Sequence, residues 1–202
     1  MFQDLPAAAI TRFHDEAHAR AGWPAEGGVH ADKPADNPWS WIETNHRYNS
    51  LLWAEEDLAR RQNVPDSAIA ANKRAIDGFN QKRNDATEKI DEAILSRLAA
   101  VAVQGNARLN SETAGSMIDR LSIMSLKIRA MREQTLRTDV DAAHIATCQA
   151  KLGKLNEQRG DLANCLDALL AGAQAGSAYY KIYRQFKMYN DPKLNPQMYK
   201  NA

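Results

Sequence analysis

The 202-residue chain contains only two cysteines and no long hydrophobic run. Cys148 and Cys165 lie 17 positions apart in one predicted helix, which corresponds to roughly 25 Å of helix rise. That distance is far beyond the reach of a disulfide, so we expect two free thiols and a reducing compartment. No apolar stretch near the N-terminus is long enough for a signal peptide or a membrane span, and we therefore expect a cytoplasmic protein.

Proline is absent from most of the interior of the chain. The seven prolines are Pro6, Pro24, Pro34, Pro38, Pro65, Pro192 and Pro196. Because proline interrupts helices, the long proline-free stretches between them predict an all-α protein. The formal charge of +1 gives no argument for nucleic-acid binding, although residues 179–202 carry +4 and the rest of the chain −3.

The pattern of apolar positions predicts a single domain over residues 1–202, an elongated antiparallel bundle of four to five long helices. The expected segments are an N-terminal helix within 1–21 capped by Asp4, a Gly/Pro loop at 22–37, a bundle core at 38–176 and a basic, aromatic tail at 177–202. Core helices are expected at 38–62, 66–103, 112–135 (capped by Ser111) and 139–174, and a short tail helix at 179–189. The length of the 66–103 helix leaves a homodimer open.

Familiar catalytic and metal-binding motifs are missing. The chain has no glycine-rich phosphate loop, no convincing Ser-His-Asp order and no Cys/His cluster at zinc spacing. His14 and His18 share a helix face, but the zinc-protease pattern needs a glutamate directly after the first histidine, and Asp15 stands there instead. We therefore interpret the two histidines as part of a surface face rather than as a metal site.

The helix at 38–62 carries a second interior face that is polar. Beside an apolar side, the residues His46, Asn49, Trp53, Glu56 and Arg60 recur at steps of three and four and form one stripe. Burying a polar group of this kind without a partner costs about 1–3 kcal/mol. The stripe is therefore expected either to pair with a matching helix or to face a ligand.

The helix at 66–103 carries a polar stripe of its own, made of Asp77, Asn80, Asn84, Glu88 and Asp91. The tight connection near residue 64 predicts that the two helices run antiparallel, with the numbers of facing residues summing to roughly 129–130. The predicted pairs are His46 with Asn84, Asn49 with Asn80 or Gln81, Trp53 with Asp77, and Glu56 or Asp57 with Lys73 and Arg74. Two interpretations stay open, a satisfied hydrogen-bond network and a polar cleft that also binds a substrate or an ion.

Charged residues inside apolar or helical runs give two further expectations. Asp119 and Arg120 interrupt an apolar run, and a buried charge needs a partner, for which Arg60, Arg83 and Lys127 are the candidates for Asp119. Glu88 and Asp91 match half of the carboxylate pattern with which all-α nucleotide pyrophosphohydrolases hold Mg²⁺, whereas the second half is missing. The pair is therefore the candidate metal site.

Four strings resemble a bacterial family catalogued as domain of unknown function 4254. They are NHRYNSLLWAEEDLAR, KRAIDGFNQKRNDATEKID, SETAGSMIDRLSIMSLKIRAMRE and YRQFKMYNDPKLNP, and the resemblance covers roughly residues 39–196. It implies a bacterial, cytoplasmic helical protein without an established activity. It also implies a link to surface-polysaccharide biosynthesis, since relatives lie near glycosyltransferase genes.

We predict a polar groove that binds a phosphorylated or nucleotide-linked sugar, or a protein that assists a glycan-assembly enzyme. The candidate ligand-binding residues are Asn49, Glu56, Arg60, Lys73, Arg74, Asn80, Arg83, Asn84, Asp119, Arg120 and Lys127. Arginine matches the geometry of phosphate, and His46 with Asp77 would transfer protons if chemistry occurs. The alternatives are a Mg²⁺-dependent hydrolase built on Glu56, Asp77, Glu88, Asp91 and Glu112, and a non-catalytic scaffold that binds a partner through its tail.

Overall fold

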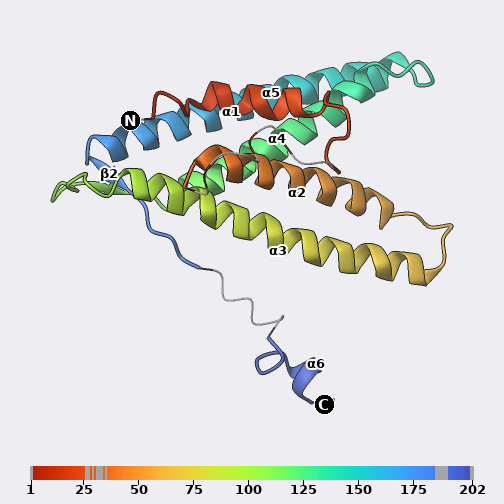
Figure 1. The fold of residues 1–202 in the computed structure, drawn as a ribbon. Helices are drawn as coiled ribbons and strands as arrows, with labels where there is room; N and C mark the ends of the chain where they lie inside the picture. Colours follow the sequence, from red (N-terminus) through yellow and green to blue (C-terminus); the bar gives the residue numbers. More distant parts are fainter. Residues whose placement is uncertain are drawn as a thin grey trace.

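The predicted all-α bundle is confirmed by a computed structural model, which describes residues 2–25, 28, 30, 34, 36–184 and 191–200 (Figure 1). The elements are α1 (Ala7–Ala17), α2 (Pro38–Leu58), α3 (Asp66–Arg97), β1 (Arg108–Leu109), α4 (Ala114–Thr135), α5 (Ala142–Gln174), β2 (Ala178–Tyr179) and α6 (Pro196–Tyr199). Among the helices described, none combines the length and the apolar character that a bilayer crossing requires.

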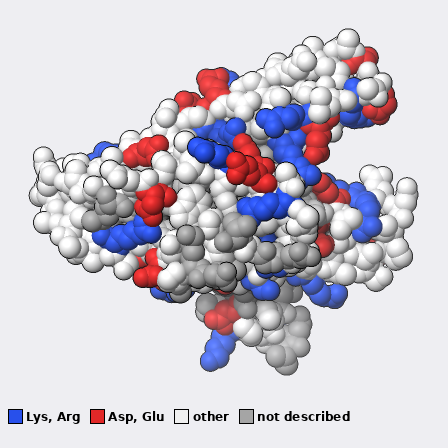
Figure 2. Space-filling model, turned by 45° about the horizontal axis from the view of Figure 1, so that its top comes forward, with Lys and Arg blue, Asp and Glu red and all other residues white. Residues whose placement is uncertain are grey.

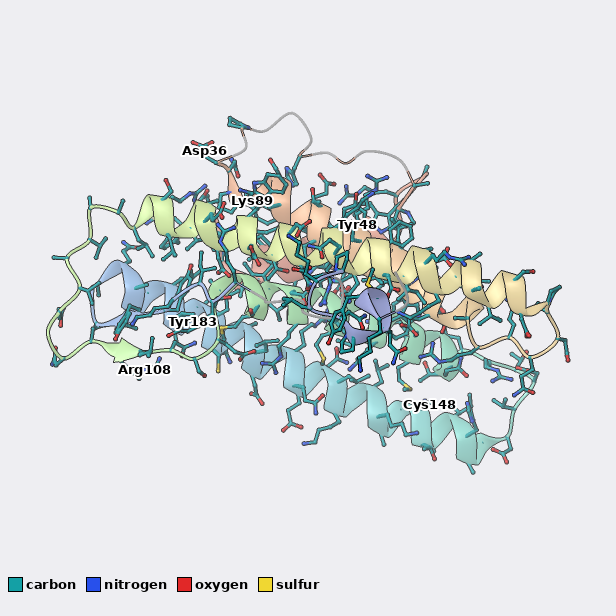
Figure 3. The ribbon with its side chains drawn as sticks, turned by 90° about the horizontal axis from the view of Figure 1, so that it is seen from below. Asp36, Tyr48, Lys89, Arg108, Cys148 and Tyr183 are labelled. Atoms are coloured by element: carbon teal, nitrogen blue, oxygen red, sulfur yellow. The ribbon has the colours of Figure 1, made fainter. Side chains whose placement is uncertain are left out.

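Two antiparallel helical hairpins build the molecule. α2 pairs with α3, α4 pairs with α5, and α1 packs on α4 and α5 (Figure 1). Seen from below, α4 runs between the α2–α3 hairpin and α5 (Figure 3). The hairpins diverge toward their connecting turns, and Figure 2 shows the notch between their far ends. The apolar core lies at the opposite end, where Ile10, Ile42, Ile90, Ile118 and Leu166 are fully buried.

The helix starts follow local capping chemistry, although two predicted caps are wrong. Asp4 does not cap α1, because its carboxylate binds Arg97 at 3.0 Å and α1 begins after Pro6. Ser111 does not cap α4 either. Thr113, two residues later, accepts the backbone N–H of Ser116 at 3.1 Å and fixes the first turn.

The chain around 98–110 and 175–180 corrects two predicted helices. α3 ends at Arg97 instead of near residue 103, because the following segment extends to meet the end of α5, where Arg108 donates its N–H to Ser177 at 2.9 Å. The predicted helix at 179–189 is wrong for its described part: Tyr179 belongs to β2, residues 180–184 are irregular, and Tyr180 is buried in the core. Residues 185–189 lie outside the described residues.

Candidate functional site

The first part of the polar stripe of α2, His46 and Asn49, is buried, but most of its partners come from α4 and not from α3. His46 Nδ1 lies 2.8 Å from the hydroxyl of Ser122, and Asn49 Nδ2 donates to Asp119 at 2.9 Å. The predicted partners Asn84 for His46 and Asn80 for Asn49 are therefore wrong. The physical reason is that α2 contacts α3 and α4 on different sides, and the stripe lies on the side of α4.

The predicted register between α2 and α3 is correct. Asn45 Nδ2 donates to Thr87 Oγ1 at 3.1 Å, and Asn72 Nδ2 donates to Glu55 at 2.6 Å, so the numbers of facing residues sum to 132 and 127. The predicted ion pairs across this interface are wrong. Glu56 pairs with Arg60 and Lys73 with Asp77, each within its own helix, and Arg74 is exposed.

Asp119 of α4 is the centre of the buried polar network. Its carboxylate accepts Asn45 at 2.8 Å, Asn49 at 2.9 Å and Arg83 at 2.8 Å. Arg83 was one of its three predicted partners, and that pairing is confirmed. Arg83 also donates to the amide oxygen of Asn80 at 2.7 Å, so its guanidinium is held by α3 and α4 together. These four groups from three helices bond one another, whereas Arg83 Nε is buried without a partner among the described residues.

A groove of about 520 Å³ opens beside this network, between α2, α3 and α4. Five of the predicted ligand-binding residues line it, namely Asn49, Glu56, Arg60, Asn80 and Arg83. The remaining lining residues are Leu52, Trp53, Asp57, Ile76, Ile123 and Leu126. The groove therefore combines apolar and aromatic walls with two guanidinium groups, two amides and two carboxylates. Arg60 stands at its rim with 68% of its side chain exposed.

The other predicted ligand-binding residues lie elsewhere. Arg120 and Lys127 line a second cavity of about 690 Å³ between α4 and α5. Asn84 lines a small cavity of about 80 Å³ with Glu88 and Asp91. Lys73 and Arg74 do not line the groove, because they point to solvent from α3.

The two candidates for proton transfer are not brought together. His46 is fully buried, and burial, followed by the neighbouring His14 and His18, lowers its pKa well below the usual value. Asp77 is exposed on α3 and pairs with Lys73. Neither residue lines the groove.

Sequence reasoning missed a cluster of aromatic and imidazole rings beneath α1. The centroid of the His46 ring lies 4.5 Å from the ring centroid of His14, 4.9 Å from that of His18 and 5.3 Å from that of Trp23. The Trp23 ring is stacked on His46. The predicted surface position of His14 is wrong, because this side chain is fully buried. The helical spacing of Ile10, Phe13, His14 and Ala17 in one apolar stripe was the signal for a buried face.

Burial keeps the clustered imidazoles neutral. It lowers the pKa of His14 to about 3 and the pKa of His18 to about 4. His18 Nε2 lies 3.2 Å from the Ser125 hydroxyl, which donates to Asp15 at 2.8 Å. Both ring nitrogens of His14 lack a hydrogen-bond partner within the part of the chain that the structure describes.

The candidate metal residues and the carboxylates of the hydrolase alternative do not gather into one centre. Asp91 is buried, and burial raises its pKa to about 6, while its carboxylate accepts the N–H of Gly115 at 2.7 Å. Glu88 lies 3.8 Å from Arg184, and Glu112 holds Arg120 at 2.7 Å. No three His, Cys, Asp or Glu side chains of the described residues are placed to hold a metal ion. The described side chains therefore do not fit a Mg²⁺ centre.

Fold and groove define an all-α protein of two splayed hairpins with a ligand-sized hollow between them. The chain belongs to the family described as protein of unknown function (DUF4254), whose model matches residues 39–182. Apart from Pro38, the matched range holds α2 to α5 and hence every residue that lines the groove. It includes the first three sequence strings and confirms their family resemblance, whereas the fourth string, at residues 183–196, lies beyond it. No curated protein and no solved structure matches the chain.

Proposed function

We propose that the groove between α2, α3 and α4 binds a phosphorylated or nucleotide-linked sugar, and that the protein acts in surface-glycan metabolism by binding rather than by hydrolysis. The observation that carries the proposal is the joint lining of one hollow by Arg60, Arg83, Asn49, Asn80 and Trp53. The volume of about 520 Å³ falls in the range of small-molecule sites, roughly 300–1,000 Å³.

Each wall of the groove has a matching part in such a ligand. Guanidinium groups bind phosphate oxygens with two parallel hydrogen bonds, and amide and carboxylate groups bind sugar hydroxyls. The flat face of Trp53 suits a sugar ring or a base. Ligand pockets typically combine apolar and aromatic walls with polar groups that fix the orientation of the ligand.

The two arginines are suited to different tasks. Arg83 is held in place by Asp119 and Asn80, which fixes its position before any ligand arrives. Arg60 forms only an exposed pair with Glu56, and such pairs contribute about 0–1 kcal/mol. Arg60 can therefore exchange that carboxylate for a phosphate at little cost, whereas Arg83 presents a preset donor.

The proposal is tested by thermal unfolding with a panel of sugar phosphates and nucleotide sugars. A ligand that binds only the folded state raises Tm by mass action. Arg60→Gln is expected to weaken binding about 10–100-fold, because a hydrogen bond to a charged group is worth about 1.5–3 kcal/mol. Stability without ligand should stay unchanged, since Arg60 is exposed.

The matched control is Arg74→Gln. It removes the same charge from the neighbouring helix at an exposed position that does not line the groove, so affinity should stay that of the natural chain. The proposal fails if no member of the panel raises Tm, or if the two variants weaken binding equally, since the effect would then be one of overall charge.

A further inference from the structure

The second cavity, between α4 and α5, shares a wall with the groove. Ile123 lines both, and the cavity of about 690 Å³ lies on the other side of this residue. On α4, Arg120 and Lys127 are three residues before and four residues after Ile123, which places all three on one stripe of the helix. α4 thus forms the floor between the α2–α3 hairpin and α5, as Figure 3 shows.

A third hollow, of about 300 Å³, adjoins the same two sites. Trp53 lines both this hollow and the groove, and Lys127 lines both this hollow and the second cavity. The side chains of Trp53, Ile123 and Lys127 are therefore shared walls between neighbouring hollows. A ligand that reaches from the groove into the second cavity has to pass over these side chains.

The two cations that line the second cavity both stand on α4, the helix that this cavity shares with the groove. Arg120 and Lys127 stand about 10 Å apart along the helix axis, as expected for seven residues. The side chain of Arg120 is 55% exposed and pairs with the carboxylate of Glu112, whose side chain is 41% exposed. Like the Arg60 pair, this exposed contact is cheap to exchange for an anionic group of a ligand.

The part of the second cavity away from α4 is lined by neutral and acidic polar groups. α5 contributes Gln158 and Asp161, and the segment before α4 contributes Asn110 and Ser111. These are hydrogen-bonding groups without positive charge, and such groups suit the hydroxyls of a sugar. Cations are thus concentrated near the shared wall, with neutral and acidic hydrogen-bonding groups beyond them.

We propose, resting on the proposed function of the groove, that its ligand is a two-part molecule that crosses Ile123, of the class of nucleoside diphosphate sugars. The ring of one end lies against Trp53 in the groove. The first phosphate pairs with Arg60 in the groove, and the second lies over α4, where Lys127 and Arg120 contact it. The sugar occupies the second cavity beside Gln158 and Asp161. A nucleoside monophosphate fills only the first part of this site.

Cys165 offers a direct test, because this exposed thiol lines the second cavity, whereas Cys148 is buried near the start of α5 (Figure 3). Alkylation by iodoacetamide is followed by mass spectrometry with three matched pairs: UMP and UDP-glucose, GMP and GDP-mannose, AMP and ADP-glucose. For at least one pair, we expect the diphosphate sugar at saturation to slow alkylation of Cys165 at least tenfold. The monophosphate should bind without protecting it.

The affinities of the same compounds, measured by calorimetry, test where the diphosphate binds. The diphosphate sugar should bind at least tenfold more tightly than its monophosphate. Lys127→Met, which keeps the apolar stem of the side chain, should remove that difference and leave the affinity for the monophosphate unchanged. The matched control is Lys151→Met, an exposed position on α5 outside these cavities, which should keep the difference.

The outcomes separate the two proposals. If neither these compounds nor the sugar phosphates of the thermal panel bind, the function proposed for the groove fails and this inference fails with it. If sugar phosphates bind but no compound of any pair does, only this inference fails. If monophosphates bind and require Arg60, but the diphosphate sugars bind no more tightly and leave Cys165 equally reactive, only the two-part ligand is refuted. If Lys127→Met keeps the full difference in affinity between the diphosphate sugar and its monophosphate, the placement of the second phosphate on α4 is also wrong.

Discussion

Replacing His14 by leucine is expected to stabilise the protein, although the side chain is fully buried. Both ring nitrogens of His14 lack a hydrogen-bond partner among the described residues. A buried polar group left without a partner costs about 1–3 kcal/mol. A neutral imidazole carries one donor and one acceptor, so the two nitrogens together cost about 2–6 kcal/mol.

The opposing loss is smaller. The ring of His14 contacts His46 at 4.5 Å and Phe13 at 5.9 Å, and ring pairs of this kind are worth about 0.5–1.5 kcal/mol each. Leucine loses these contacts but fills a similar volume with apolar atoms, which limits any packing defect. We therefore expect a net rise of about 1–3 kcal/mol in the free energy of unfolding.

Urea unfolding at pH 7 measures the effect as a higher midpoint at an unchanged slope. The matched control is His46→Leu, which removes one of the two partners of the Ser122 hydroxyl, the other being Asn49, within the network around Asp119 and should destabilise the protein. If His14→Leu lowers the midpoint as much as His46→Leu does, the imidazole of His14 has a favourable partner, and the reasoning is wrong.

The same variant should reduce the sensitivity of the fold to acid. In the unfolded chain His14 binds a proton near pH 6.5, whereas burial lowers its pKa in the folded protein to about 3. Its contribution to stability is therefore complete above pH 6.5 and is lost progressively as the pH falls toward 3. Between pH 7 and pH 5 this loss is about 2 kcal/mol for His14 alone, and His14→Leu should lack it.

Two further substitutions test the packing of α3 against the start of α4. Asp91→Asn should stabilise the protein by about 1–3 kcal/mol at pH 8. Burial raises the pKa of Asp91 from 3.8 to about 6, so the stabilising contribution of this group is complete below pH 3.8 and is lost as the pH rises through 6. Urea titrations at pH 5 and pH 8 measure the gain in stability of Asp91→Asn. An equal gain at both pH values would contradict this reasoning. Gly115→Ala should lower stability by about 1–3 kcal/mol, because its Cβ would lie 2.5 Å from the carbonyl oxygen of Thr87, whereas the control Gly78→Ala has open space and should not destabilise.

The sequence predicted the geometry of the α2–α3 hairpin because the connection is short. A tight turn leaves one antiparallel register, and the contacts between Asn45 and Thr87 and between Glu55 and Asn72 agree with it within three residues. The helical spacing of the two polar stripes also gathered five residues that line one groove, namely Asn49, Trp53, Glu56, Arg60 and Asn80. The need of a buried charge for a partner left three candidates for Asp119, of which Arg83 is the one that pairs with it. Local periodicity carries this information because it fixes which side chains share a face.

Periodicity could not show which neighbour occupies that face. α2 contacts α3 and α4 on two sides, and both offer polar residues, so the partners of His46 and Asn49 were assigned to the wrong helix. Long-range competition also misled the prediction of the cap at Asp4, whose carboxylate binds Arg97, 93 positions away. A candidate partner at that separation leaves no local signal in the sequence.

One part of the polar stripe of α2 belongs to a closed hydrogen-bond network, and another part lines the groove. Its first part is closed, because His46 lies beneath α1 against His14 and Trp23. Its last part is open, because Glu56 and Arg60 line the groove. Asn49 stands between the two, for it lines the groove and also bonds Asp119 and Ser122. Its Nδ2 has only two hydrogens for three acceptors within 3.2 Å, the third being the amide oxygen of Asn45. Asn49 is therefore the residue at which the buried hydrogen-bond network meets the groove.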